Sequence, residues 1–289
     1  GYLLGVAGML MLSLTLIALK FGLESFSPIT MSLGRVFPAA IVAVIALRTM
    51  RARLLPPKED LVRVLGLTIG VVIAFPVITS YGLEHITPGQ AGVLGALGPI
   101  ITAALSVLYG HKHPGRIFWI ASSLGTLSAI GFALTRSADD PGDGDLLWYG
   151  LMLLAVVLWC WGQVTGGTLT GKHHSIQILA WAILLGTPIN AVIAGVDLWI
   201  NPLTEWPTLS AWFGFLYVAL VSMFLVFFVW YAAMDRIGMV KTSQLQLAQP
   251  IVTLLVSMWL FGEQVAPSTW VFALLIMGAV AWTQSIRRR

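Results

Sequence analysis

Long apolar runs separated by short polar stretches cover this chain from end to end. A helix that crosses the hydrocarbon core of a bilayer needs about 20 mostly apolar residues. Ten runs approach or reach that length: residues 2–19, 28–47, 61–80, 88–109, 117–134, 146–165, 175–196, 210–234, 242–261 and 268–286. The pattern therefore predicts an all-α membrane protein with ten transmembrane helices.

Polar residues and prolines mark where several of these helices begin and where the chain divides. Ser27-Pro28 and Thr87-Pro88 each place an N-cap residue before a proline at the first helical position. The segment 135–145 is rich in Asp, Gly and Pro, which favours an exposed connection. We expect this segment to separate two halves of the chain.

The composition supports a membrane protein and excludes several other classes. Hydrophobic residues make up 58% of the 289 residues and charged residues only 10%, whereas a soluble domain carries about 25% charged residues. The single cysteine, Cys160, excludes a disulfide framework and a thiolate metal cluster. The sequence contains neither a phosphate-binding loop nor a zinc-protease motif, so we expect no cofactor and no metal.

The basic residues predict the orientation of the helices in the membrane. If the chain crosses ten times, 13 of its 16 Lys and Arg residues lie on one side and nine of its 12 acidic residues lie on the other. The 13 are Arg48, Arg51, Arg53, Lys58, Arg63, Lys112, Arg116, Lys172, Arg236, Lys241 and Arg287 to Arg289. The positive-inside rule then places both termini in the cytoplasm. The basic charge is therefore a topology signal, and no nucleic-acid partner is expected.

The two halves of the chain share a pattern around their fourth helices. The stretch that begins at Tyr81 aligns with the stretch that begins at Tyr231, and Pro99 aligns with Pro250. Span four therefore matches span nine, which makes each half a repeat of five spans. Because five is odd, the second repeat inserts upside down relative to the first.

Three motifs carry a resemblance to a known family: Ser27-Pro28…Arg35, Tyr81…Pro88…Pro99, and Tyr231…Pro250…Phe261-Gly262-Glu263. With them the chain resembles the drug/metabolite transporter (DMT) superfamily, EamA type, and its nearest branch is the YddG-like amino-acid exporters. The resemblance implies two inverted five-helix repeats, here 1–137 and 146–286, around a central cavity. One departure is that the family's frequent Trp-Gly in the first helix is replaced by Met11-Leu12-Ser13-Leu14.

The function that this resemblance implies is secondary transport in the inner membrane of a bacterium. The expected activity is export of small metabolites, amino acids including aromatic ones, by alternating access. A sugar or nucleotide-sugar transporter of the same fold is the alternative, followed by a channel and an intramembrane enzyme. The expected partners are a small-molecule substrate and the lipid bilayer. The small-xxx-small glycine pairs are too common in membrane helices to indicate a dimer, so the expected assembly is a monomer.

A polar stripe in span nine supplies the main candidate for substrate contact. Thr242, Gln246, Gln249 and Thr253 lie at i, i+4, i+7 and i+11, which is one face of a helix. Lipid would penalise this face, so it should meet either water in a cavity or a neighbouring helix. The matching positions in span four include Gly95 and Gly98, which leave room for a polar solute.

The aligned prolines are candidate hinges. Pro99 and Pro250 each remove a backbone donor and free a carbonyl near the middle of a span. A free carbonyl at that depth is tolerated only inside the bundle or beside water. We therefore expect both helices to bend at these prolines during transport.

Further candidates lie on other spans. Trp159 and Gln163 share a face of span six and suit an amphipathic solute, although Trp159 could be an ordinary core residue. Tyr81 could gate the cavity or belong to the interfacial aromatic belt, and Tyr217 is a deeper cavity candidate. Ser13, in the first span, completes the set.

Two basic residues, Lys20 and Arg35, have two interpretations each. Ser13, Lys20 and Glu24 share a face of span one, so Lys20 could pair with Glu24 or attract a substrate carboxylate. Arg35 lies about 10 Å inside span two, where a guanidinium needs a partner. It could be paired structurally, for example with Glu24, or it could serve function.

Histidines and glycine pairs have simpler interpretations. His111, His113, His173 and His174 have no fixed metal-ligand spacing and are expected to be interfacial. The pairs Gly66…Gly70, Gly162…Gly166 and Gly167…Gly171 predict places where helices pack closely.

Overall fold

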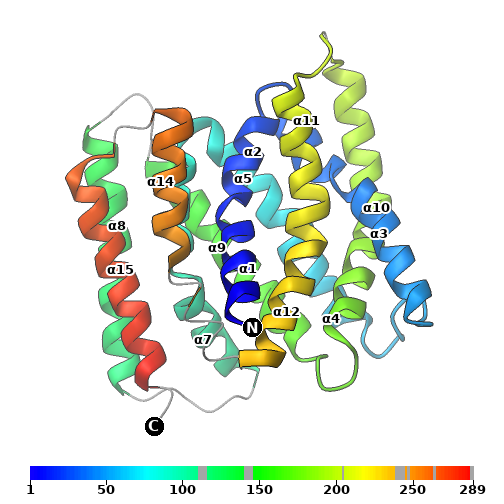
Figure 1. Cartoon of the computed structure of the whole chain (residues 1–289), viewed down its shortest axis with the longest axis horizontal. Helices are drawn as coiled ribbons and strands as arrows, with labels where there is room; N and C mark the ends of the chain where they lie inside the picture. Colours follow the sequence, from blue (N-terminus) through cyan, green and yellow to red (C-terminus); the bar gives the residue numbers. More distant parts are fainter. Residues whose placement is uncertain are drawn as a thin grey trace. The chain divides into compact units, whose positions relative to one another are not determined.

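The computed structural model describes residues 1–109, 116–139, 146–203, 205–237, 245, 248–262 and 265–286. Within these ranges every element is helical and no strand occurs, which confirms the all-α class (Figure 1). Seven stretches are long and apolar enough to cross a membrane: Tyr2–Gly22, Thr30–Thr49, Leu61–His85, Pro88–Leu108, Leu146–Gly167, Ser175–Ile200 and Leu209–Trp230. The chain is a multi-pass membrane protein.

The other three expected spans coincide with shorter apolar helices in the described part of the chain. These are Ser123–Phe132, Gln249–Phe261 and Pro267–Ala279. They lie in helices of 24, 13 and 20 residues, Arg116–Asp139, Gln249–Phe261 and Pro267–Ile286, but their apolar stretches within the described residues are shorter than the about 20 residues that a span needs. The count of ten transmembrane helices, their inverted order and the cytoplasmic position of both termini therefore stay predictions.

The helices form two compact units. Unit 1 contains Gly1–Ile17, Gly82–Val157 and Trp230–Arg289, and unit 2 contains Ala18–Tyr81 and Leu158–Val229. Each unit takes segments from both expected halves, 1–137 and 146–286, so the units are not the halves. One boundary follows Tyr81 and another precedes Trp230, close to the two tyrosines that the sequence comparison aligned. The division into sequence halves stays a prediction.

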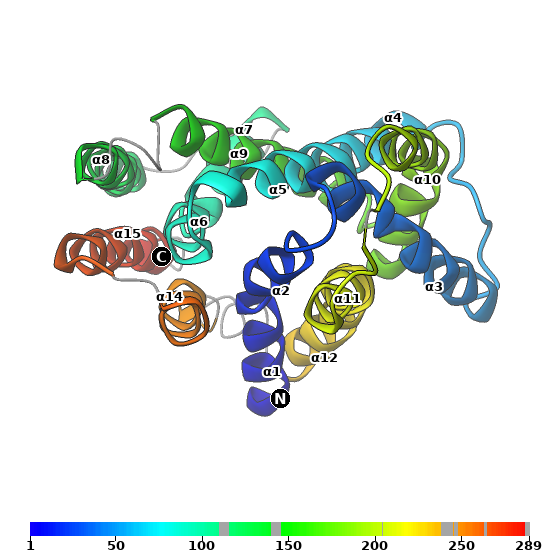
Figure 2. The same cartoon turned by 90° about the horizontal axis from the view of Figure 1, so that it is seen from above.

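Unit 1 is built from helices at the beginning, middle and end of the chain. They are α1 (Tyr2–Ser13), α6 (Pro88–Gly95), α7 (Gly98–Leu108), α8 (Arg116–Asp139), α14 (Gln249–Phe261) and α15 (Pro267–Ile286), with the first half of α9 (Leu146–Gly167) and the later part of α12 (Val226–Ile237). Helices α8 and α15 lie side by side (Figure 2), and α14 packs against α6 and α1. Phe132 of α8 is fully buried, with its ring 5.9 Å from that of Tyr149 on α9 and 6.2 Å from that of Phe272 on α15.

Unit 2 contains three π-helical segments among its helices. Its elements are most of α2 (Thr15–Gly22), η1 (Thr30–Gly34), α3 (Val36–Thr49), α4 (Leu61–Leu67), η2 (Thr68–Ala74), α5 (Phe75–His85) as far as Tyr81, the second half of α9, α10 (Ser175–Ile200), α11 (Leu209–Leu216) and η3 (Tyr217–Leu225). Helix α10 packs along α3, η1 and η2. Trp181 of α10 is 1% exposed, and its indole Nε1 donates to the Arg53 carbonyl at 2.7 Å, so this large side chain is both buried and satisfied.

The expected helix caps are present. The Thr87 hydroxyl accepts from the Gln90 amide at 3.3 Å, and the Gln90 side chain accepts from the Thr87 amide at 3.0 Å. This reciprocal capping box satisfies two donors that the start of α6 leaves unpaired. The Ser27 hydroxyl accepts from the Thr30 amide at 3.0 Å. At the other end of a helix, Gly262 stops α14 with φ of 63°, a left-handed conformation that favours glycine.

Two of the three predicted glycine pairs mark close packing in unit 2. A Cβ at Gly70 would lie 2.9 Å from Cα of Gly162, and a Cβ at Gly66 would lie 2.8 Å from Thr165 Cγ2. Gly166 is similarly close to Leu67, so the helices of spans three and six cross on their glycines. The prediction for Gly167…Gly171 is wrong. Apart from its own helix, neither of these two glycines has an atom of the described residues within 4 Å of its Cβ position.

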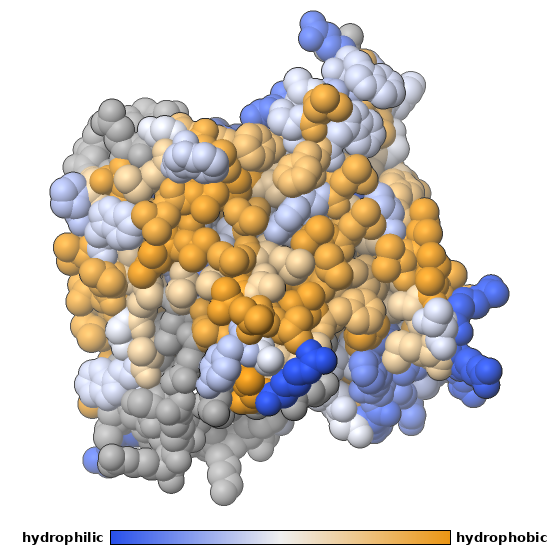
Figure 3. All heavy atoms as spheres, in the orientation of Figure 1, coloured by the Kyte–Doolittle hydropathy of each residue, from blue (hydrophilic) through white to orange (hydrophobic). Residues whose placement is uncertain are grey.

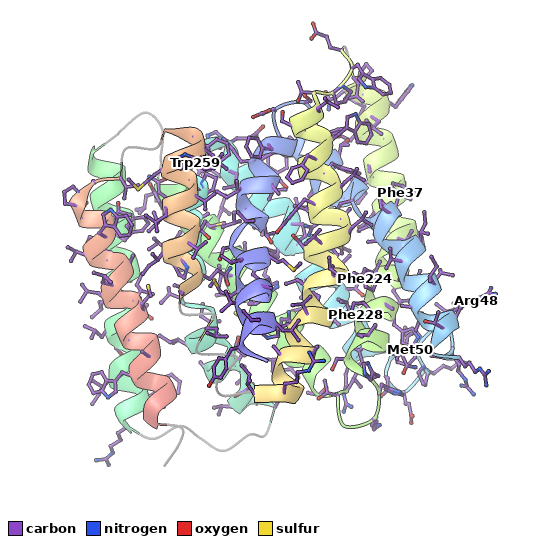
Figure 4. The ribbon with its side chains drawn as sticks, viewed as in Figure 1. Phe37, Arg48, Met50, Phe224, Phe228 and Trp259 are labelled. Atoms are coloured by element: carbon purple, nitrogen blue, oxygen red, sulfur yellow. The ribbon has the colours of Figure 1, made fainter. Side chains whose placement is uncertain are left out.

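The outer face of α3 shows how the chain meets lipid. Phe37, Ile41 and Ile45 are 46%, 64% and 56% exposed and recur every four residues, which places them on one side of the helix. Figure 4 shows Phe37 projecting outward from α3, with Arg48 and Met50 near its other end. Hydrophobic residues cover this face and hydrophilic residues gather beyond the end of the helix (Figure 3). This distribution suits a helix immersed in a bilayer.

Candidate functional site

In unit 1 two predicted site residues contact each other directly. The Thr253 hydroxyl donates to the Ser13 carbonyl at 3.0 Å, and the Thr253 and Ser13 side chains are 1% and 0% exposed. The Ser13 hydroxyl donates to the Met9 carbonyl at 2.8 Å. The contact joins α14 to the first span at the point where α1 ends and α2 begins. Thr253 therefore connects two helices. Of the two environments considered for the polar stripe, a water-filled cavity or a neighbouring helix, this residue meets a neighbouring helix.

The predicted hinge prolines lie at helix interruptions. Helix α6 ends at Gly95 and α7 begins at Gly98, so Pro99 is the second residue of α7. Helix α14 begins at Gln249, so Pro250 is also a second residue. A proline fits the first turn of a helix because the missing amide hydrogen has no partner there. The two aligned prolines thus share the same local structure, and their role as hinges stays a prediction.

The remaining unit 1 candidates differ in exposure. Gln249 is half-buried at the start of α14, Gly95 is exposed and Gly98 is buried. A Cβ at Gly95 would meet no atom within 4 Å, whereas one at Gly92, a turn earlier, would lie 3.1 Å from Thr253. A side chain at Gly95 would therefore clash with none of the residues that the structure describes. Thr242 and Gln246 lie outside the described residues, so the full stripe stays a prediction.

The other candidates belong to unit 2. The Trp159 ring lies 6.0 Å from that of Phe75, and both Trp159 and Gln163 are half-buried on α9. Tyr217 begins η3, where its ring lies 5.9 Å from Phe213. Tyr81 is 37% exposed. Whether these residues contact a common substrate stays a prediction.

Charged residues in unit 2 have partners that the sequence did not indicate. Glu24 accepts the Ser210 hydroxyl at 2.8 Å. Its pairing with Lys20 stays a prediction. Asp197, near the end of α10, accepts hydrogen bonds from Ser27, from Thr30 at 2.8 Å and from Asn201 at 3.0 Å. Such a set satisfies a carboxylate at the end of a span.

A second cluster lies at the start of α4 and of α10. The Nε2 atom of His173 donates to Asp60 Oδ2 at 2.8 Å, and the Lys172 ammonium lies 3.6 Å from Asp60 Oδ1. The hydrogen bond from His173 holds the pKa of Asp60 below its ordinary value, and the Lys172 charge acts in the same direction. His174 accepts from the Ile176 amide as the N-cap of α10. These two histidines are thus structural, while His111 and His113 lie outside the described residues.

Four buried polar side chains of unit 2 lack partners. Within the described ranges, no hydrogen bond reaches Arg35 Nε, Thr79 Oγ1, Ser80 Oγ or either amide atom of Asn190. The expected pairing of Arg35 is therefore not seen there. Asn190 could have been singled out from the sequence as an amide in an apolar run. Thr79 and Ser80 could not, because their hydroxyls can bond to their own helix.

Comparison with known proteins gives a consistent result along the whole chain. A model of the EamA-like transporter family matches residues 1–134 and 146–284. The uncharacterized transporter YdeK of Bacillus subtilis (strain 168) is 30% identical over 290 residues, which cover 100% of this chain and 97% of YdeK. The uncharacterized inner membrane transporter YedA of Escherichia coli (strain K12) is 25% identical over 273 residues, covering 92% and 84%. Protein PecM of Dickeya dadantii (strain 3937) is 26% identical over 267 residues, covering 88% and 84%.

A structural comparison agrees with the sequence comparisons. One protein of solved crystal structure is 15% identical to this chain and superposes on it with a TM-score of 0.66. The match covers 99% of this chain and 98% of the other protein's chain. At this identity the likeness shows a common fold. YdeK and YedA are named as transporters and not as enzymes. Because the family model matches most of the chain and YdeK matches it from end to end, the chain belongs to the EamA-like transporter family, within the DMT superfamily.

Proposed function

We propose that this chain is a secondary transporter of the bacterial inner membrane that exports small metabolites, amino acids foremost, by alternating access. The observation that carries the proposal is the family match over residues 1–134 and 146–284, in a chain with seven helices of spanning length. The name of YedA as an inner membrane transporter supports the location.

The interrupted helices support a mechanism in which the chain changes shape. Transporters of several folds use discontinuous helices at their substrate sites, because the free backbone groups there can bind solute or ions. Here α6 and α7 are separated before Pro99, and α14 begins beside Pro250. We propose that these two points bend as the binding site opens first to one side of the membrane and then to the other.

Amino acids are proposed because the candidate residues combine amide and aromatic groups. In unit 1, Gln249 is half-buried beside the interruption at Pro250. In unit 2, Gln163 follows Trp159 by one turn of α9, and both are half-buried. An amide can bond to the amino or carboxylate group of a solute, and an aromatic ring suits its apolar side chain.

The proposal is tested by flux into liposomes that contain the purified full chain. Labelled amino acids, sugars and quaternary cations are each offered with and without unlabelled solute inside, and liposomes without protein serve as the control. Saturable uptake that is accelerated by internal amino acids supports the proposal. Linear uptake indicates a channel, and uptake inhibited by sugars but not by amino acids contradicts the substrate class.

A further inference from the structure

The four partnerless polar residues of unit 2 come from three different segments. Arg35 directly follows η1 and is 6% exposed, Thr79 and Ser80 lie on α5, and Asn190 lies on α10; the last three are completely buried. Apart from Asp60 Oδ1, which lies beside Lys172, their atoms make up all the unpaired buried side-chain atoms found in the described part of the chain. We call these four residues the polar layer.

Two contacts establish how the segment that carries Arg35 lies along α10. Thr30 donates to Asp197 at 2.8 Å near the end of α10, and Trp181 donates to the Arg53 carbonyl at 2.7 Å near its start. The two segments therefore run in opposite directions. Arg35 lies five residues beyond Thr30, which is about 7.5 Å at about 1.5 Å per residue. Its backbone is thus level with a point on α10 about five residues before Asp197.

The segment that carries Thr79 and Ser80 runs in the same direction as α10. The Thr68 hydroxyl donates to the Ala182 carbonyl at 3.0 Å, a pair separated by 114 residues. Val72 and Gly186 have the same separation, and a Cβ at Gly186 would lie 3.2 Å from Val72 Cγ1. The two contacts lie one turn apart, so they define one parallel register between η2 and α10.

The same register indicates a similar depth for the members of the polar layer. Continued at the same rise, the separation of 114 sets Ser80 at the depth of Ala194 and Thr79 one residue earlier, although α5 does not pack along α10 as η2 does. Asn190 lies one turn below Ala194 on the same buried side of α10. Arg35, from the opposite direction, reaches the same level. All four residues therefore lie within about one helical turn, about 5.4 Å, of one another along the unit.

This layer lies within membrane-spanning segments, where its unpaired groups are unfavourable. A guanidinium is always charged, and burying it without a partner costs more than burying a neutral group. The Asn190 amide offers two hydrogen-bond donors and one acceptor oxygen, and each of the two hydroxyls can donate or accept a hydrogen bond. Arg35 directly follows the π-helical segment η1, and α5, which carries Thr79 and Ser80, directly follows η2. Such π-helical turns are frequent at functional sites.

We infer that Arg35 and Asn190 of the polar layer bind the carboxylate group of the transported solute, with Arg35 as the charged contact and Asn190, on the helix that packs against the Arg35 segment, as the hydrogen-bonding contact. This inference rests on the proposed function and specifies its substrate class as carboxylate-bearing solutes. One carboxylate neutralises one guanidinium and can accept two of its parallel N–H groups. A phosphate, with nearly two negative charges, would leave the layer with a net negative charge.

The first test measures binding to the purified full chain. Several L-amino acids and their carboxamides, in which an uncharged amide replaces the carboxylate, are compared by the shift that each causes in the thermal unfolding midpoint. The amino acids should raise the midpoint and the carboxamides should not. In Arg35→Gln the amino-acid affinity should fall about tenfold to a hundredfold, because a hydrogen-bonded charge is lost. Equal shifts by amino acids and carboxamides would overturn the inference.

The unliganded stability of the variants separates a ligand contact from a structural one. Because the layer is unpaired in this structure, Arg35→Gln and Asn190→Leu should unfold without ligand at or above the wild-type temperature. Should Arg35→Gln fail to fold, Asn190→Leu decides, and an unchanged amino-acid affinity in that variant overturns the inference. Thr187→Val is the matched control, since the Thr187 hydroxyl bonds to the Ile183 carbonyl of the same helix. It should keep the full amino-acid response.

Flux measurements distinguish failure of this inference from failure of the proposed function. Saturable flux that is as fast for carboxamides as for amino acids, and unchanged in Arg35→Gln, retains the transporter and removes the carboxylate site. The absence of saturable flux for every amino acid, sugar and cation tested removes the proposed function, and the inference with it. Saturable amino-acid flux that is lost in Arg35→Gln, with folding intact, supports both.

Discussion

The hydroxyl of Thr253 donates a 3.0 Å hydrogen bond to the carbonyl of Ser13, where the first span is interrupted. Residues at opposite ends of the chain are therefore joined inside unit 1. The bond satisfies both the hydroxyl of α14 and a carbonyl at the end of α1, neither of which meets water at that depth.

Removing this bond should weaken unit 1 slightly. Thr253→Val keeps the shape of the side chain and removes the donor, and we expect a loss of about 0.6 kcal/mol in the free energy of unfolding, as for other hydrogen bonds between membrane helices. Unfolding in mixed micelles measures the change. Thr253→Ser retains the donor and should stay within error of the wild type. A Thr253→Val variant of wild-type stability would show that the bond contributes nothing.

Substitution of the glutamines in the polar stripe of span nine should reduce transport without impairing folding. Gln246→Leu and Gln249→Leu replace amides by apolar groups of similar size, so insertion into the membrane should be unaffected or improved, while amino-acid flux should fall. Flux into liposomes is compared with the amount of folded protein. Gln244→Leu is the control, because a helix turns by about 200° between Gln244 and Gln246 and so points the two side chains to opposite faces. Full transport by both stripe variants would refute the assignment.

The aligned prolines should control the rate of exchange. Pro99→Ala and Pro250→Ala allow α6 to continue into α7 and α14 to extend toward its N-terminus, because alanine restores the amide donor and favours a helix. We expect slower counterflow with little change in substrate affinity. Pro38→Ala, in the first turn of α3, is the control. Equal counterflow in all three variants would argue against hinges at Pro99 and Pro250.

The cluster at Asp60 predicts a stability that depends on pH. Its lowered pKa means that the carboxylate stabilises the folded chain fully above the unfolded-state value of about 3.9. That contribution is lost as the pH falls through the lower folded-state pKa. Asp60→Asn should therefore unfold at a lower temperature than the wild type at neutral pH, and the difference should shrink in acid. Thermal unfolding from about pH 7 to about pH 3 checks this.

A matched variant isolates the effect of that buried carboxylate. Glu59→Gln changes the exposed neighbour of Asp60 and should leave the unfolding temperature nearly unchanged across the same range. If Asp60→Asn instead differs from the wild type by a constant amount at every pH, the stabilisation does not come from the ionised carboxylate.

The glycine crossing in unit 2 predicts a steric cost. A Cβ at Gly70 would meet the Leu158 carbonyl oxygen and lie 2.9 Å from Cα of Gly162, so Gly70→Ala must push the two helices apart. We expect a loss of about 1–3 kcal/mol in the free energy of unfolding. Gly195→Ala is the control, since no atom lies within 4 Å of its Cβ position. Its stability should be unchanged or slightly raised by the better helix propensity of alanine.

The local features of the fold were predictable because they depend on neighbouring residues. The capping box at Thr87, the N-cap at Ser27 and close packing at the pairs Gly66…Gly70 and Gly162…Gly166 are all present. Each follows from residue type and spacing along one helix. The aligned positions of Pro99 and Pro250 were also visible as a repeat, and both prolines are second residues of a helix.

The partners of polar side chains could not be predicted, because they depend on how distant segments pack. Thr253 bonds to Ser13 on another helix, Asp197 accepts from Ser27 and Thr30, and Asp60 pairs with His173. None of these pairs has a spacing that a sequence motif would mark. The division into two units that cross the sequence halves has the same origin.

Taken alone, the sequence determined that this protein is a bundle of membrane helices with a repeated internal pattern, because hydrophobic length and helix punctuation are local properties. Only the tertiary structure decided which polar groups are satisfied. It gave Thr253 and Asp60 their partners and left Arg35 and Asn190 buried without any among the described residues. Satisfaction of a buried polar group depends on what surrounds it in space, and in a helical membrane protein those surroundings come from segments far apart along the chain.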